Sequence, residues 1–252
     1  RGGLGHVTAV TGFDPALTVL VYSALAALAA GLGALPGLFR RRPPAAVLGL
    51  ANALASGLMI GVAYMLLTVG LVEGAPQGAV GALLGVFFVR ATHAITGTGE
   101  LDRDDPGPEH GYRVILLDTL HAAHEGVAIG IAMLISLPFG IAMALALAVH
   151  NIPEAVVLTE MLGSRGLRVH QAGGLAIAVN LNQVLLAVTT FAVVGAAPIL
   201  FPWVVGFAVG ALLYLVLVEL LPVSYQQAGS TGIALVTVVA MVMVVLLADA
   251  QA

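Results

Sequence analysis

The stretch from residue 114 to residue 162 reads VILLDTLHAAHEGVAIGIAMLISLPFGIAMALALAVHNIPEAVVLTEML, and it decides the fold class. Two long apolar runs are separated by the turn LPFG at 137–140, and each is long enough to cross a bilayer as a helix at about 20 residues per crossing. We predict these helices over 114–135 and 139–162. The short turn predicts that they are antiparallel neighbours.

The rest of the chain has the same character. Its 252 residues are 60% apolar and only 9% charged, whereas soluble proteins usually carry about a quarter charged residues. The net charge is −4 and there is no basic patch, which argues against a nucleic-acid partner. We therefore predict one all-α membrane domain over 1–252, with eight transmembrane helices at 16–38, 45–70, 78–96, 114–135, 139–162, 172–196, 203–221 and 231–248.

The positive charges predict the orientation. All nine are arginines; eight flank alternate connections, and only Arg1 falls on the other side. Cytoplasmic loops of membrane proteins carry an excess of positive residues. We therefore expect these connections in the cytoplasm and both termini outside it, for a protein of the cell (inner) membrane. The eight are Arg40, Arg41, Arg42, Arg90, Arg103, Arg113, Arg165 and Arg168.

The second and seventh predicted helices share a pattern of Gly-x-x-x-Gly followed by Tyr and Glu. The matching residues are Gly57, Gly61, Tyr64 and Glu73 in one helix and Gly206, Gly210, Tyr214 and Glu219 in the other. In an eight-helix chain these helices run in opposite directions, as in transporters built from inverted repeats. We therefore expect inverted repeats around a central pair, the fourth and fifth helices. Close helix packing alone also explains the glycine spacing.

Two His-x-x-x-Glu pairs carry the candidate chemistry, His121 with Glu125 on the fourth helix and His150 with Glu154 on the fifth. A charged group inside a bilayer costs about 2.5 to 3.5 kcal/mol on insertion scales, so such groups usually face a cavity or each other. Glu125 and His150 both fall about 16 Å along their helices, near the centre of a ~30 Å core. We expect the four side chains to converge there and to bind a divalent cation such as Zn²⁺, Fe²⁺ or Mn²⁺.

Other polar residues lie along the same helices. Asp118 and His124 share the face of the fourth helix that carries the first pair, although a hydrogen bond between helices explains His124 equally well. Glu160 and Glu219 lie toward the cytoplasmic ends of their helices, where we expect them to line an exit or to pair with an arginine. His93 is interpreted as a boundary residue without a role.

The motifs HAAHEG at 121–126 and HNIPEA at 150–155, together with the eight-helix layout, resemble the ZIP (Zrt/Irt-like protein) family of divalent metal transporters, bacterial type. The resemblance covers nearly all of the chain. It implies a fold of two inverted three-helix repeats around the fourth and fifth helices, transport into the cytoplasm, and frequent dimers. It also implies metal ligands at His121, Glu125, His150, Asn151 and Glu154, and a thioether ligand at Met59.

The sequence departs from the family pattern in two places. Ala122 and His124 stand where many members have Asn and Pro, and the sixth helix offers Asn180, Asn182 and Gln183 where some bacterial members have a Glu. We therefore expect one well-formed metal site and a second that is weakened or lost, with His124 as a gate or an alternative ligand. Asn182 is a secondary pathway candidate, and the other two amides are expected to make hydrogen bonds between helices.

These observations predict a carrier that moves a divalent transition metal into the cytoplasm by alternating access. Zn²⁺ is the first candidate, with Fe²⁺, Mn²⁺ and Cd²⁺ open, and no organic cofactor and no catalysis are expected. The expected partners are the metal ion, the lipid bilayer and a second copy of the chain. Two alternatives are a metal-selective channel and an intramembrane metal-dependent hydrolase; against the hydrolase, Ala128 stands where the H-E-x-x-H motif requires its second His.

Overall fold

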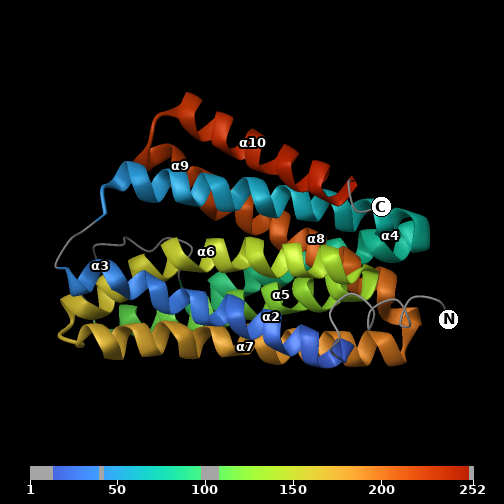
Figure 1. Cartoon of the computed structure of the whole chain (residues 1–252), viewed down its shortest axis with the longest axis horizontal. Helices are drawn as coiled ribbons and strands as arrows, with labels where there is room; N and C mark the ends of the chain where they lie inside the picture. The colour runs from blue at the N-terminus through green and yellow to red at the C-terminus, as the bar shows by residue number, and fades with distance from the viewer. Residues whose placement is uncertain (1–13, 40–42, 98–107, 250–252) are drawn as a thin grey trace.

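The computed structural model describes residues 14–39, 43–97 and 108–249 (Figure 1). Within these ranges the chain is helical between short turns and contains no strand, which confirms the predicted all-α class. The elements in chain order are α2 (Pro15–Ala29), the 3₁₀ segment η1 (Ala30–Ala34), α3 (Leu35–Leu38), α4 (Ala45–Thr96), α5 (Pro108–Ile135), α6 (Leu137–Ser164), α7 (Val169–Ala196), η2 (Pro198–Leu200), α8 (Phe201–Leu215), the π-helical segment η3 (Val216–Leu220), α9 (Leu221–Gln227) and α10 (Ser230–Asp249).

Seven helices in the described residues are long and apolar enough to cross a membrane. They cover Pro15–Leu38, Ala45–Gly70, Val72–Thr96, Gly111–Ile135, Leu137–Ser164, Val169–Ala196 and Pro198–Gln227. The eighth expected helix is present as α10, whose apolar stretch Ser230–Leu246 is shorter than the others. Seven of the eight expected spans are therefore found near their predicted positions, and an eighth crossing stays a prediction.

One connection is shorter than predicted and one helix is longer. The expected second and third helices are both present within α4, as the spans Ala45–Gly70 and Val72–Thr96, and the backbone leaves the helical conformation at Gly74 (φ 167°, ψ 82°), between the predicted helices. Pro76 follows the bend, where its missing N–H costs no helical hydrogen bond. The seventh helix also continues beyond its predicted end, through η3 and α9. The proline at the start of α9 cannot donate to the preceding turn, and the wider π turn next to it contains Glu219.

The helices pack as two groups, which Figure 1 shows one above the other. In the first, the α4–α8 bundle, α4 packs along α8, α9 and α10; in the second, the α5–α7 bundle, α5, α6 and α7 pack with α2, η1 and α3. Glycines allow the helices of each bundle to approach closely. A side chain at Gly206 would collide with Gly78, and one at Gly126 would collide with the carbonyl of Gln183.

The arginine-bearing connections that the structure describes lie at one end of the molecule. Arg165, at the end of α6, packs against Gly111 in the first turns of α5, and Arg113 packs against Gly97, which ends α4. Arg40, Arg41, Arg42 and Arg103 lie outside the described residues. We refer to this end as the arginine end.

Candidate metal centre

Three potential metal ligands meet where α5 and α6 pack together. His150 Nε2 lies 3.3 Å from Glu125 Oε1 and 3.7 Å from Glu154 Oε2, and the three ligand atoms all lie within 4.8 Å of one another. The Glu125 and His150 side chains are 1% and 3% exposed, whereas Glu154 is 26% exposed. We call this group the α5–α6 site.

The tight turn between α5 and α6 explains why these residues meet. Ser136 alone separates the two helices, and its hydroxyl accepts a hydrogen bond from the N–H of Phe139 to cap α6. Pro138, in the first turn of α6, needs no helical hydrogen-bond donor there. The antiparallel hairpin predicted from the LPFG turn is therefore confirmed, and it holds Glu125 beside His150.

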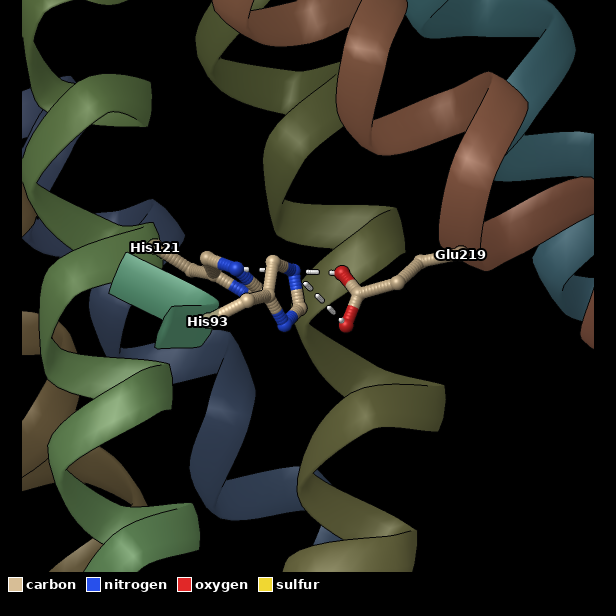
Figure 2. A group of neighbouring side chains, drawn as sticks. All are labelled: His93, His121 and Glu219. Carbon is tan, nitrogen blue, oxygen red and sulfur yellow. Dashed lines mark ion pairs between the residues drawn. The ribbon is translucent and has the colours of Figure 1, made fainter. Parts of the chain in front are cut away.

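A second group of potential ligands lies beside the first. Figure 2 shows His93 from α4, His121 from α5 and Glu219 from η3 pointing toward one another. His93 Nε2 is 3.5 Å from Glu219 Oε1, and His121 Nε2 is 3.7 Å from Glu219 Oε2. Because α4 and η3 belong to one bundle and α5 to the other, we call this group the inter-bundle site.

Amide side chains hold the α5–α6 site in place from the α7 side. The Asn151 amide donates to the carbonyl oxygen of Ala26 (3.0 Å) and to Oε1 of Gln183 (3.2 Å). Gln183 Nε2 in turn donates to Glu125 Oε2 (3.5 Å). This chain leaves Glu125 Oε1 facing His150, which is how outer hydrogen bonds orient metal ligands in proteins.

The family model described as ZIP zinc transporter matches residues 92–247, which include both groups of ligands. The chain belongs to the ZIP family. Among curated proteins, it is 32% identical over 224 residues to "Putative zinc transporter At3g08650" of Arabidopsis thaliana and 29% identical over 237 residues to "Zinc transporter GufA" of Myxococcus xanthus. These alignments cover 86% and 85% of this chain, but 36% of the plant protein and 92% of the bacterial one. Family membership and the seven apolar helices make this an integral membrane protein.

The four ligands expected at a single point are divided between two sites in this ZIP protein. Glu125, His150 and Glu154 meet, but His121 lies with Glu219 and His93 instead. His121 is one helical turn from Glu125, and its Nε2 lies 3.7 Å from Oε2 of Glu219 on the other bundle. The sequence pattern could not show this neighbouring carboxylate.

Three residues have contacts in the structure that differ from the roles expected from the sequence. His93, to which no role was assigned, contributes to the inter-bundle site, and the expected exit residue Glu219 is the centre of that site. Gln183, which was expected only to join helices, contacts Glu125 as well. Its position in the sixth-helix stretch, where the family resemblance implies an acidic ligand, is the signal that could have identified it.

Two further amides on α7 have structural contacts. Asn182 Nδ2 donates to the carbonyl oxygen of Thr119 (2.9 Å) and so joins α7 to α5. Asn180 donates to the carbonyl oxygen of Ala176 within α7 itself. Asn182, predicted as a pathway residue, therefore connects two helices of the α5–α7 bundle.

The remaining predicted residues belong to neither group of three. His124 is 1% exposed, and its ring packs edge-on against His121 and Phe88, with ring centroids 5.7 Å and 6.3 Å apart. Asp118 and Glu160 are partly buried on α5 and α6, nearer the arginine end of these helices. Met59, implied as a ligand by the family resemblance, is buried in the apolar core.

The surroundings of the two sites differ between the two ends of the molecule. Between the α5–α6 site and the turn at Ser136, the side chains of Ile129, Met143 and Leu147 are fully buried in the apolar core. On the side of the arginine end, Glu154 and Glu219 are 26% and 27% exposed. Buried apolar side chains therefore fill the side of the α5–α6 turn, whereas one carboxylate of each site is partly exposed.

Proposed function

We propose that this chain carries a divalent transition-metal cation across the membrane and that the cation binds at the α5–α6 site on its way. The observation that carries this proposal is the meeting of Glu125, His150 and Glu154 inside a helical membrane domain. One imidazole and two carboxylates are ligands that Zn²⁺ accepts, and two ionised carboxylates neutralise a +2 ion. Buried charges without such a partner would be costly in a membrane.

Zinc is the proposed cargo because both relatives described above are named as zinc transporters. The ligand chemistry is compatible with this choice, although Fe²⁺, Mn²⁺ and Cd²⁺ are accepted by similar sets of imidazole and carboxylate. Zn²⁺ is usually four-coordinate in proteins. Asn151 Oδ1 is buried and has no hydrogen-bond partner in the described part of the chain, so it is available as a further oxygen ligand, as the family resemblance implies.

The proposed direction is into the cytoplasm. The excess of arginine at the arginine end supports a cytoplasmic position for that end, with both termini outside. On this assignment the buried Ile129, Met143 and Leu147 lie on the outer side of the site, and the proposal takes the arrangement as the inward-facing state of an alternating-access cycle in an inner membrane. Asp118 and Glu160 then lie along the exit, on the cytoplasmic side of Glu125 and His150.

The packing of the Gly-x-x-x-Gly motifs supports the proposed inverted repeat. Gly57, in the second predicted helix, lies against Thr237 of the eighth, and Gly206, in the seventh, lies against Gly78 of the third. An inverted repeat relates the second helix to the seventh and the third to the eighth. Under this relation the contact between the second and eighth helices corresponds to the contact between the seventh and third. This is the relation that two inverted three-helix repeats require.

Zinc uptake into proteoliposomes that contain a zinc-sensitive dye tests the proposal. Glu125→Gln and His150→Ala are expected to reduce uptake at least tenfold, because each removes a ligand from the α5–α6 site. Glu73→Gln and His170→Ala make the same chemical changes at exposed positions and are the matched controls. Wild-type rates in both site variants would contradict the proposal, and saturation at a turnover well below channel rates would separate a carrier from a channel.

A further inference from the structure

Helix α6 is weakened between its two metal ligands. Pro153 lies between His150 and Glu154, and its nitrogen has no hydrogen to donate to the carbonyl oxygen of Val149. One helical hydrogen bond is therefore missing at the level of the α5–α6 site. Helices bend at such positions, so the relative position of His150 and Glu154 depends on support from outside α6.

The first membrane span, Pro15–Leu38, makes contacts on both sides of this proline. Its elements α2 and η1 pack against α6 and α7 (Figure 1). Before the proline, the Asn151 amide donates to the carbonyl oxygen of Ala26 (3.0 Å). After it, the Thr159 hydroxyl donates to the carbonyl oxygen of Gly33 (3.1 Å). The two bonds therefore connect α6 to the first span on either side of its missing helical bond.

The change from α-helix to 3₁₀ helix within the first span explains the earlier contact. In a continuous α-helix the N–H of Ala30 would donate to the carbonyl of Ala26, four residues back. It donates instead to the carbonyl of Ala27, three residues back, where η1 begins. The carbonyl of Ala26 accepts from Asn151 in its place. Because the same amide group also donates to Gln183, its orientation is fixed. Its oxygen, which has no partner among the described residues, remains for a metal ion.

A glycine allows the later contact. The backbone of Gly33 lies so close to α6 that a Cβ here would be 2.6 Å from the carbonyl carbon of Ala155 and 2.7 Å from the nitrogen of Val156. Ordinary contact requires at least 3.4 Å, so a methyl group would displace this part of α6 by about 0.8 Å. Ala155 directly follows Glu154 in the chain. Since metal–ligand distances vary by only about 0.2 Å, this displacement is large enough to disturb the position of Glu154.

We infer that the first membrane span sets the positions of the metal ligands on both sides of the proline in α6. Gly33 and Thr159 are positioning residues for Glu154, and the carbonyl of Ala26 positions Asn151 in the same way. These groups are not ligands themselves; they act through α6, as the hydrogen-bond partners of metal ligands do in other proteins. The inference rests on the proposed function, because it takes the α5–α6 site as the site of the cargo metal.

The first test is the zinc affinity of the purified protein, measured by competition with a chelating dye. The ion of interest is the one whose binding His150→Ala abolishes. Gly33→Ala is expected to bind it at least about tenfold more weakly than the wild type, as changes beside metal ligands usually do. Gly37→Ala, on the same span, is the matched control and should bind zinc normally, because its methyl group would meet Val169 at an ordinary 3.4 Å.

A second control separates displaced ligands from lost stability. A Cβ at Gly57 would collide with the carbonyl of Thr237 in the α4–α8 bundle, which contains none of the three ligands of the α5–α6 site. Gly57→Ala is therefore expected to unfold at a lower temperature but to bind zinc normally while folded. Wild-type affinity in folded Gly33→Ala, or the same loss of affinity in Gly57→Ala, would overturn the inference.

Thr159 offers a variant that adds no atom to the packing, and it decides the question if Gly33→Ala does not fold. Thr159→Val keeps the shape of the side chain but removes the hydroxyl that donates to Gly33. We expect about a threefold to tenfold loss of zinc affinity. Thr159→Ser keeps the hydroxyl and should bind zinc like the wild type. Normal affinity in Thr159→Val, or equal losses in both variants, would contradict the inference.

A double-mutant cycle tests whether Gly33 acts through Glu154. In a Glu154→Gln background, Gly33→Ala is expected to weaken zinc binding by less than about threefold, because the ligand that it displaces is already lost. A tenfold loss in both backgrounds would overturn the inference. If Glu154→Gln alone leaves zinc affinity unchanged, the proposed site is wrong and the inference falls with it. Zinc binding that follows these expectations without zinc uptake would count against the proposed transport alone.

Discussion

Replacement of Gln183 by Met tests how the metal site is held in position. Met has a similar length and fills the same space, but it removes the amide that donates to Glu125 Oε2 and the oxygen that accepts from Asn151. A hydrogen bond to a charged group contributes about 1.5 to 3 kcal/mol. At 3.5 Å the bond to Glu125 is long, so we take the lower value. This corresponds to about a tenfold loss of zinc affinity, the lower end of the range for partners of metal ligands.

The assay is zinc titration of purified Gln183→Met protein, together with thermal unfolding in the same detergent. A positioning role predicts weaker zinc binding with little change in the unfolding temperature without metal, because the Asn151 amide keeps its bond to the Ala26 carbonyl. Leu185→Ala, at an exposed position on the same helix, is the control and should bind zinc like the wild type. Wild-type affinity in the folded Gln183→Met variant would refute the reasoning.

Three further predictions concern pH and packing. Zinc uptake should fall as the pH drops from about 7.5 to about 5, because carboxylate and imidazole ligands bind metal only when deprotonated; flat uptake over this range would count against these ligands. Gly126→Ala should lower the free energy of unfolding by about 1 to 3 kcal/mol, because its side chain would meet the Gln183 backbone; thermal unfolding should show no such loss for Gly163→Ala, which has open space around it. Asn182→Ala should lower stability by about 1 kcal/mol, through its lost bond to Thr119, and leave uptake per folded molecule unchanged; an equal loss of uptake would make Asn182 part of the transport path.

Local sequence features predicted much of the fold and half of the site. The long apolar runs identified the helices, and the short connection near LPFG predicted α5 and α6 as antiparallel neighbours, although LPFG itself forms the first turn of α6. Once these helices are paired, equal depth brings Glu125 to His150, so the α5–α6 site follows from spacing alone. The Gly and Pro of EGAPQ at 73–77 also predicted the break between the second and third helices, which the structure has at Gly74.

The inter-bundle site could not be predicted in this way. It brings together His93, His121 and Glu219, which lie on three elements far apart in the sequence and in different bundles. Their meeting depends on how the bundles pack and on the π turn that contains Glu219. The contact of His121 with Glu219 depends on the same packing, which a pattern within one helix does not contain.

The most direct test of the account is an anomalous difference map, recorded at the zinc absorption edge from crystals of the zinc-loaded protein. The account predicts a peak between Glu125, His150 and Glu154, with the metal about 2.0 to 2.2 Å from their ligand atoms. A zinc-loaded protein that transports zinc but has no peak between these three side chains would contradict the central claim.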